Sequence, residues 1–70
     1  MTTPISDATA DEVKDALRAC ESIQSVNACA VQYAQSVVRM QKGSRVDKIM
    51  AIQIKNLAAY RRKMLREHDA

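Results

Sequence analysis

The sequence predicts an all-α protein, in which a short N-terminal helix is followed by an antiparallel hairpin of two longer helices that can complete a bundle by dimerisation. Three observations support this fold class. The chain contains one Gly and one Pro in 70 residues. Apolar residues recur at helical spacing in three segments. Apolar residues make up 47% of the chain, but Phe and Trp are absent, so the core is aliphatic and small. A chain of this length buries only about 60% of its surface, and burial against a second copy would add stability.

The first helix is expected to begin at Thr9, within one structural unit spanning residues 9–67. Thr9 precedes Glu12 by three residues, the spacing of a capping box, in which each side chain binds the backbone N–H of the other residue. Residues 1–8 are expected to be flexible and residues 68–70 to fray. One apolar face follows the cap at spacings of three, four and seven residues: Val13, Ala16, Leu17 and Cys20.

The second helix carries the most regular apolar pattern in the chain. Two serines, Ser22 and Ser25, can cap a new helix after a soft break. The apolar positions then follow a 3-4-3-4-3 spacing: Ile23, Val26, Ala30, Tyr33, Val37 and Met40. This spacing predicts one helix with coiled-coil-like packing, because it lasts for about two and a half heptads only.

The third helix is expected over residues 45–67. Gly43 is suited to the left-handed residue that ends a helix, and Ser44 with Asp47 is suited to starting the next one. The predicted apolar face contains Val46, Ile49, Met50, Ile54, Leu57, Tyr60 and Met64. Gln53 falls within this face, where it is either solvated at the edge or a buried polar group that fixes register.

Nothing in the sequence indicates enzymatic chemistry. No nucleophile stands beside a base, and no phosphate-binding loop occurs. Cys20 and Cys29 match neither a zinc site nor a redox motif, so they are expected to be buried or half-buried free thiols, with a disulfide as the alternative. We therefore expect no cofactor, no metal and no small-molecule substrate. No segment has the character of a signal or membrane-spanning sequence, which predicts a cytoplasmic protein that does not enter a membrane.

Charge is distributed unevenly along the chain. Residues 1–21 contain five acids and two bases (net −3), whereas residues 22–70 contain nine bases and three acids (net +6). Four cations are predicted to align on one side of the third helix, opposite its apolar face. We call them the cation row: Lys48, Lys55, Arg62 and Arg66. Such a row can follow a phosphate backbone, bind an acidic protein surface, or simply face water.

Two functions remain. The first is a noncatalytic helical interaction module, an accessory or regulatory protein that binds another protein or a second copy of itself. Its predicted interface consists of ten side chains: Ile23, Val26, Ala30, Tyr33, Val37, Met40, Met50, Leu57, Tyr60 and Met64. The alternative is a small basic nucleic-acid-associated protein that binds the phosphate backbone through the cation row.

Overall fold

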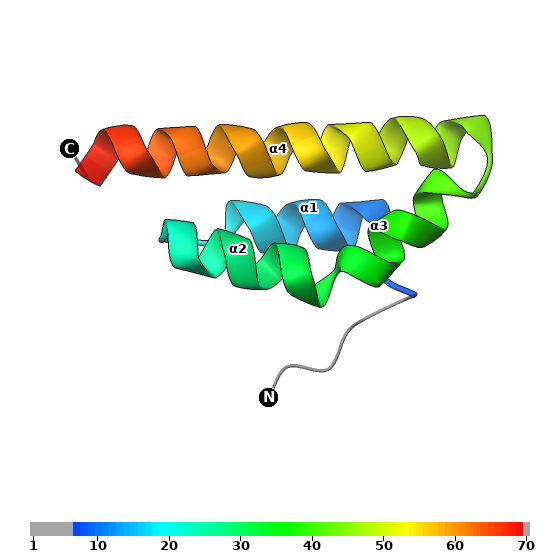
Figure 1. Cartoon of the computed structure of the whole chain (residues 1–70), viewed down its shortest axis with the longest axis horizontal. Helices are drawn as coiled ribbons and strands as arrows, with labels where there is room; N and C mark the ends of the chain where they lie inside the picture. The colour runs from blue at the N-terminus through cyan, green and yellow to red at the C-terminus, as the bar shows by residue number, and fades with distance from the viewer. Residues whose placement is uncertain (1–6, 70) are drawn as a thin grey trace.

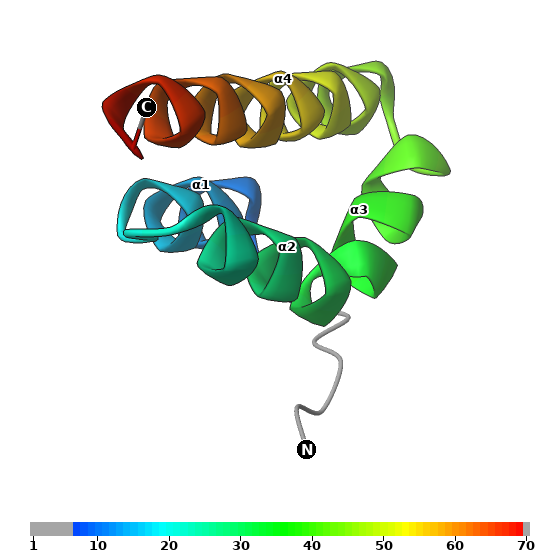
Figure 2. The ribbon, with the colours of Figure 1, turned by 60° about the vertical axis from the view of Figure 1, so that its left-hand side comes forward.

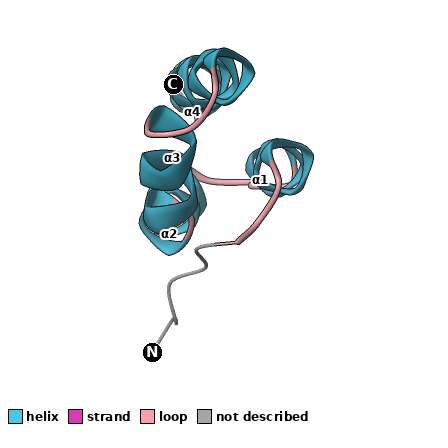
Figure 3. Ribbon diagram, turned by 90° about the vertical axis from the view of Figure 1, so that its right-hand side faces the viewer, coloured by secondary structure: helices cyan, strands magenta, loops and turns pink. Residues whose placement is uncertain are grey.

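The computed structural model describes residues 7–69, with side chains through residue 68. Within this range every regular element is helical, which confirms the all-α class: α1 Ala10–Arg18, α2 Ile23–Gln32, α3 Ala34–Gln41 and α4 Arg45–Asp69 (Figure 1). The helices form a thin molecule with extents of 39 × 28 × 14 Å. α4 runs along its whole length, and α1, α2 and α3 all pack against α4 (Figures 1 and 2). Viewed end on, α1 lies on one side and α2 and α3 lie on the other (Figure 3).

The start of α1 is fixed by local hydrogen bonds, as its sequence predicts. The Glu12 N–H donates to Thr9 Oγ1 at 3.2 Å, and the Thr9 N–H donates to Glu12 Oε2 at 3.3 Å, so the capping box is present. Most of the predicted flexible segment 1–8 lies outside the described residues. Within them, Ala8 is buried, and its carbonyl accepts a hydrogen bond from Arg39 Nη2 at 3.1 Å. Ordered structure therefore extends at least one residue before the cap.

The predicted second helix is two helices, because the chain bends at Tyr33. Tyr33 has φ −100° and ψ 9°, outside the helical region. Hydrogen bonds still span the bend, since the Tyr33 N–H donates to the Cys29 carbonyl and the Val37 N–H donates to the Tyr33 carbonyl. Val26 in α2 and Met40 in α3, on either side of the bend, both belong to the buried core. The expectation of one continuous helix is therefore wrong.

The connection from α3 to α4 differs from its prediction in backbone conformation. No described glycine has a positive φ, so Gly43 is not left-handed. A Cβ at Gly43 would collide with the side chain of Asp47. That carboxylate accepts from the Ser44 N–H at 3.2 Å, and the Asp47 N–H donates to Ser44 Oγ at 3.3 Å. Gly43 is needed for this close approach, and the predicted roles of Ser44 and Asp47 in starting α4 are confirmed.

The buried face of α4 is rotated from the predicted face. Its fully buried side chains are Ala51, Ile54 and Ala58. Four members of the predicted face are instead exposed: Val46, Ile49, Tyr60 and Met64. Gln53 is also exposed, and its Oε1 accepts a hydrogen bond from Lys14 Nζ of α1 at 2.7 Å. Two of the three described buried residues of α4 are thus alanines, and four larger apolar residues of the predicted face are exposed to solvent.

Candidate functional site: an apolar groove bordered by two cations

A groove with a volume of about 360 Å³ lies between α4 and the pair α2–α3. α1 contributes Val13 and Leu17 between the two walls, and both side chains are almost completely buried. The wall formed by α2, α3 and the bend has the polar Gln41 among otherwise mostly apolar residues: Cys29, Ala30, Tyr33, Ala34, Val37 and Val38. The opposite wall is formed by α4: Ile54, Lys55, Ala58 and Arg62.

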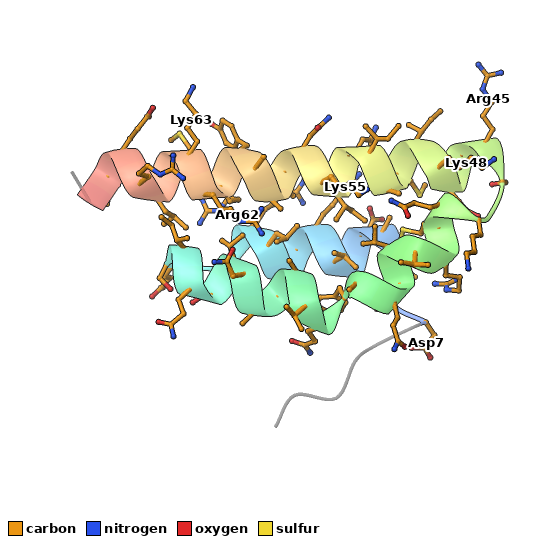
Figure 4. The ribbon with its side chains drawn as sticks, viewed as in Figure 1. Asp7, Arg45, Lys48, Lys55, Arg62 and Lys63 are labelled. Carbon is orange, nitrogen blue, oxygen red and sulfur yellow. The ribbon has the colours of Figure 1, made fainter. Side chains whose placement is uncertain are left out.

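Lys55 and Arg62 are the only charged side chains among those that line the groove in the described structure. Figure 4 shows both of them on the side of α4 that faces the other helices. Arg62 Nε donates to Asn27 Oδ1 of α2 at 2.8 Å, so this guanidinium is held across one end of the groove. Within residues 7–68, neither Lys55 Nζ nor the two terminal nitrogens of Arg62 have a hydrogen-bond partner. These donors are therefore available to an anionic ligand group.

The electrostatic character of the groove follows from the composition of its walls. α2 and α3 contain no Asp or Glu, so no acid on that wall neutralises the cations of α4. Lys55 and Arg62 are seven residues apart, which places them about two turns, or roughly 10 Å, apart along the helix axis. The groove therefore combines an apolar surface with positive charge along one edge.

The structure places the predicted interface residues in three different environments. Val26 and Met40 are buried in the core of the chain itself. Six are half-buried: Ile23, Ala30, Tyr33, Val37, Met50 and Leu57. Tyr60 and Met64 are exposed on α4. The ten residues therefore do not form one surface, although Ala30, Tyr33 and Val37 meet in the groove.

The cation row is likewise placed differently from its prediction. Lys48, Lys55 and Arg66 are exposed and Arg62 is half-buried. Lys55 and Arg62 stand beside the buried face of α4 and not opposite it, because that face is rotated towards them. Two other cations, Arg45 and Lys63, point away from the remaining helices (Figure 4).

Several groove residues were not predicted from the sequence as site residues. Val38 is the most informative, because it lines the groove with 46% of its surface exposed. It lies next to Val37 in sequence but outside the heptad pattern. Val37 and Val38 come together with Ile54 and Ala58 through the bend at Tyr33 and the packing of α1. No local sequence signal specifies that arrangement.

The two cysteines, Cys20 and Cys29, lie near each other. Both are free thiols, half-buried at Cys20 and buried at Cys29, as the sequence predicts. Cys20 Sγ donates to the Ala16 carbonyl at 3.2 Å. Burial is the main cause that raises the pKa of the Cys29 thiol to about 11, and the nearby Cys20 thiol makes a smaller contribution in the same direction. Cys29 therefore stays protonated at neutral pH and is a poor nucleophile.

The described residues bring no three His, Cys, Asp or Glu side chains together as metal ligands. None of the helices within that range is both long enough and apolar enough to cross a lipid bilayer.

Comparison of the chain with protein-family models, with curated proteins and with solved structures gives no match in any of the three. No relative therefore assigns a class or a function, and the geometry of the groove carries the functional inference.

Proposed function

We propose that this protein is a noncatalytic interaction module whose groove binds an acidic amphipathic helix of a partner protein. One observation carries the proposal: an apolar groove that contains three of the predicted interface residues also contains two unpaired cations of the cation row, Lys55 and Arg62. A helix that buries its apolar face in a hydrophobic groove is a recurrent mode of peptide recognition. Acidic residues along one edge of that helix would then face the cations of α4.

The form of the groove favours a helix over a small molecule. Its volume of about 360 Å³ is near the lower limit for small-molecule sites, and the groove is open along one side. Small-molecule sites typically bury about 70–90% of the ligand's surface, whereas an open groove leaves one side of its ligand exposed. Two cations separated by about two turns also match two acids on one face of a bound helix, seven residues apart.

The proposal is tested with a synthetic amphipathic peptide that carries Glu at two positions seven residues apart, and with the same peptide carrying Lys at those positions. Fluorescence anisotropy is expected to show binding of the acidic peptide and no binding of the basic one. Lys55→Glu should abolish the binding. Lys63→Glu is the matched control, because this residue lies on the same helix and points away from the groove (Figure 4). Equal effects of the two substitutions would contradict the proposal.

A second pair of variants tests the apolar part of the groove. Val38→Glu places a charge on the groove wall at a half-exposed position, so it should prevent peptide binding without unfolding the protein. Ile49→Glu introduces the same side chain at a similarly exposed position outside the groove and should leave peptide binding unchanged. If Val38→Glu binds the peptide normally, the partner does not occupy the groove.

Nucleic-acid binding is the second candidate, and one observation favours it: Lys48, Lys55 and Arg66 are all exposed along one side of α4. Lys48 and Arg66 do not line the groove, so these two residues distinguish nucleic-acid binding from peptide binding, whereas Lys55 would serve both. Binding of duplex or single-stranded nucleic acid with a steep salt dependence, flattened by alanine at Lys48 and Arg66, would establish this function. No binding at low salt would eliminate it.

The sequence-based proposals of dimerisation and of a cytoplasmic location both remain proposals. Dimerisation through the predicted second-helix interface would have to leave Val26 and Met40 in place, because both are buried within the chain. These two residues therefore do not contact a second copy in a dimer of the folded protein, whereas the other predicted interface residues retain exposed surface.

A further inference from the structure

We propose that the outward face of α4 pairs with the same face of a second copy, with the two helices antiparallel. This surface, the outward stripe, consists of Val46, Ile49, Tyr60 and Met64. Each of these side chains is between 43% and 57% exposed. Among the described residues no helix covers them, since α1, α2 and α3 pack on other sides of α4 (Figure 3).

The spacing of the stripe suits a helix pair related by a two-fold axis. Two apolar residues lie near the start of α4 and two near its end, at nearly equal distances from residue 55. In an antiparallel pair centred there, Val46 of one copy lies opposite Met64 of the partner subunit. Ile49 lies near the partner's Tyr60. The apolar pair near the start of α4 in one copy therefore packs against the apolar pair near the end of α4 in the partner subunit.

The centre of the outward stripe is polar, and its amide groups can form hydrogen bonds with the same groups of a second copy across a two-fold axis. Gln53 and Asn56 are both exposed and lie between the two apolar pairs. Amides are donors and acceptors at once, so the amides of two copies can bind one another across the axis. Gln53 Oε1 already accepts from Lys14, which leaves its NH₂ group to donate. Polar residues at such positions fix the register and orientation of helix pairs.

Charge at the ends of α4 determines the orientation. Arg45 is the first residue of α4, and Glu67 lies in the last turn. Both oppose the helix dipole, which favours acids at the N-terminus and bases at the C-terminus. They are 22 residues apart and so lie about 40° apart around the helix, beside the outward stripe. Neither has an ion-pair partner within residues 7–68.

An antiparallel pair brings Arg45 of each copy close to Glu67 of the partner subunit and so forms two opposite-charge pairs. A parallel pair would instead place Arg45 beside Arg45 and Glu67 beside Glu67. Charge complementarity therefore selects a second copy in antiparallel orientation as the occupant, and it explains why these two charges stand at the unfavourable ends of the helix.

Sedimentation equilibrium across a range of protein concentrations tests the proposal. The unaltered chain is expected to form a reversible dimer. Ile49→Glu should make it monomeric while its helical circular dichroism is retained. Val38→Glu is the matched control, because it introduces the same charge at a similarly exposed position in the groove and should leave the dimer intact. A monomer at all concentrations up to millimolar would overturn the proposal.

Charge reversal tests the orientation separately. Arg45→Glu and Glu67→Arg should each weaken association by about tenfold, because the two-fold axis makes each change act twice. The double variant should recover the original affinity. Both single changes improve the match to the helix dipole, so weaker association cannot be attributed to a less stable helix. Single variants that dimerise normally, or a double variant that does not recover, would refute the antiparallel arrangement. Loss of the groove's peptide binding would not affect either result.

Discussion

Two isoleucines of α4 provide a direct test of which face of this helix is buried. The sequence places Ile49 and Ile54 on the same apolar face, whereas the structure leaves 47% of Ile49 exposed and only 4% of Ile54. Replacing a buried Ile with Ala typically costs about 2–5 kcal/mol. Because Ile54 also borders the open groove, the resulting cavity is not fully enclosed, and we expect a loss of about 3 kcal/mol for Ile54→Ala.

Ile49→Ala is expected to cost much less. Half of its side chain is already in water and its removal leaves no cavity, so the loss should stay below about 1 kcal/mol. The better helix propensity of Ala offsets a few tenths of a kcal/mol of this loss. A 70-residue domain has a total stability of roughly 3.5–10 kcal/mol, so Ile54→Ala alone should remove a large fraction of it.

The assay is urea unfolding followed by far-ultraviolet circular dichroism, at low protein concentration so that dimerisation does not contribute. In thermal unfolding, the loss at Ile54 corresponds to a decrease of about 12–24 °C in Tm for a domain of this size. Ile49→Ala should shift Tm by a few degrees at most. Equal losses for the two variants would show that the described rotation of α4 is wrong.

Three further predictions concern single contacts. Gly43→Ala should destabilise the protein by about 1 kcal/mol in urea unfolding, because the new methyl group displaces the Asp47 carboxylate from the cap of α4. Thr9→Ala should cost a similar amount through loss of the α1 cap, whereas Thr9→Ser should retain most of the stability. The free energy of unfolding should decrease as pH rises from 9.0 through about 11. The pKa of the Cys29 thiol is raised in the folded state, so the unfolded chain loses this proton at lower pH than the folded chain does. The stability difference between the unaltered chain and Cys29→Ala should change with pH over that interval, and a constant difference would contradict the raised pKa.

The features that the sequence predicts correctly are those determined by neighbouring residues. The capping box of Thr9 and Glu12 depends on residues three positions apart, and so does the cap formed by Ser44 and Asp47. Such contacts require only local backbone geometry. The all-helical class and the start of α4 at Arg45 follow for the same reason.

The bend at Tyr33 could not be predicted in this way. The surrounding residues include no Gly or Pro, and the heptad pattern continues through the bend. The helices on either side of the bend contribute Val26 and Met40 to a core that they share with α1 and α4. Tertiary packing of this kind can override a regular local pattern.

The face of α4 was mispredicted for a different physical reason. Periodicity gives most weight to large apolar side chains, but two of the three described buried residues of α4 are Ala51 and Ala58. Alanine contributes little buried area, yet it permits neighbouring helices to approach closely. This rotation moves Lys55 and Arg62 to the groove and leaves the outward stripe exposed, so neither surface is evident from the sequence alone.

The two proposed surfaces lie on different sides of α4, so both can be occupied at once. Ile49 of the outward stripe and Lys55 of the groove are six residues apart and lie about 120° apart around the helix. A dimer formed through the outward stripe would therefore carry two open grooves. A partner protein with two acidic helices, or with two copies of one, would bind such a dimer with an avidity well above that of a single groove. Ile49→Glu should remove this gain and preserve the affinity for a single helix. If Ile49→Glu is monomeric and still binds the two-helix partner more tightly than a single helix, the avidity does not arise from pairing of α4.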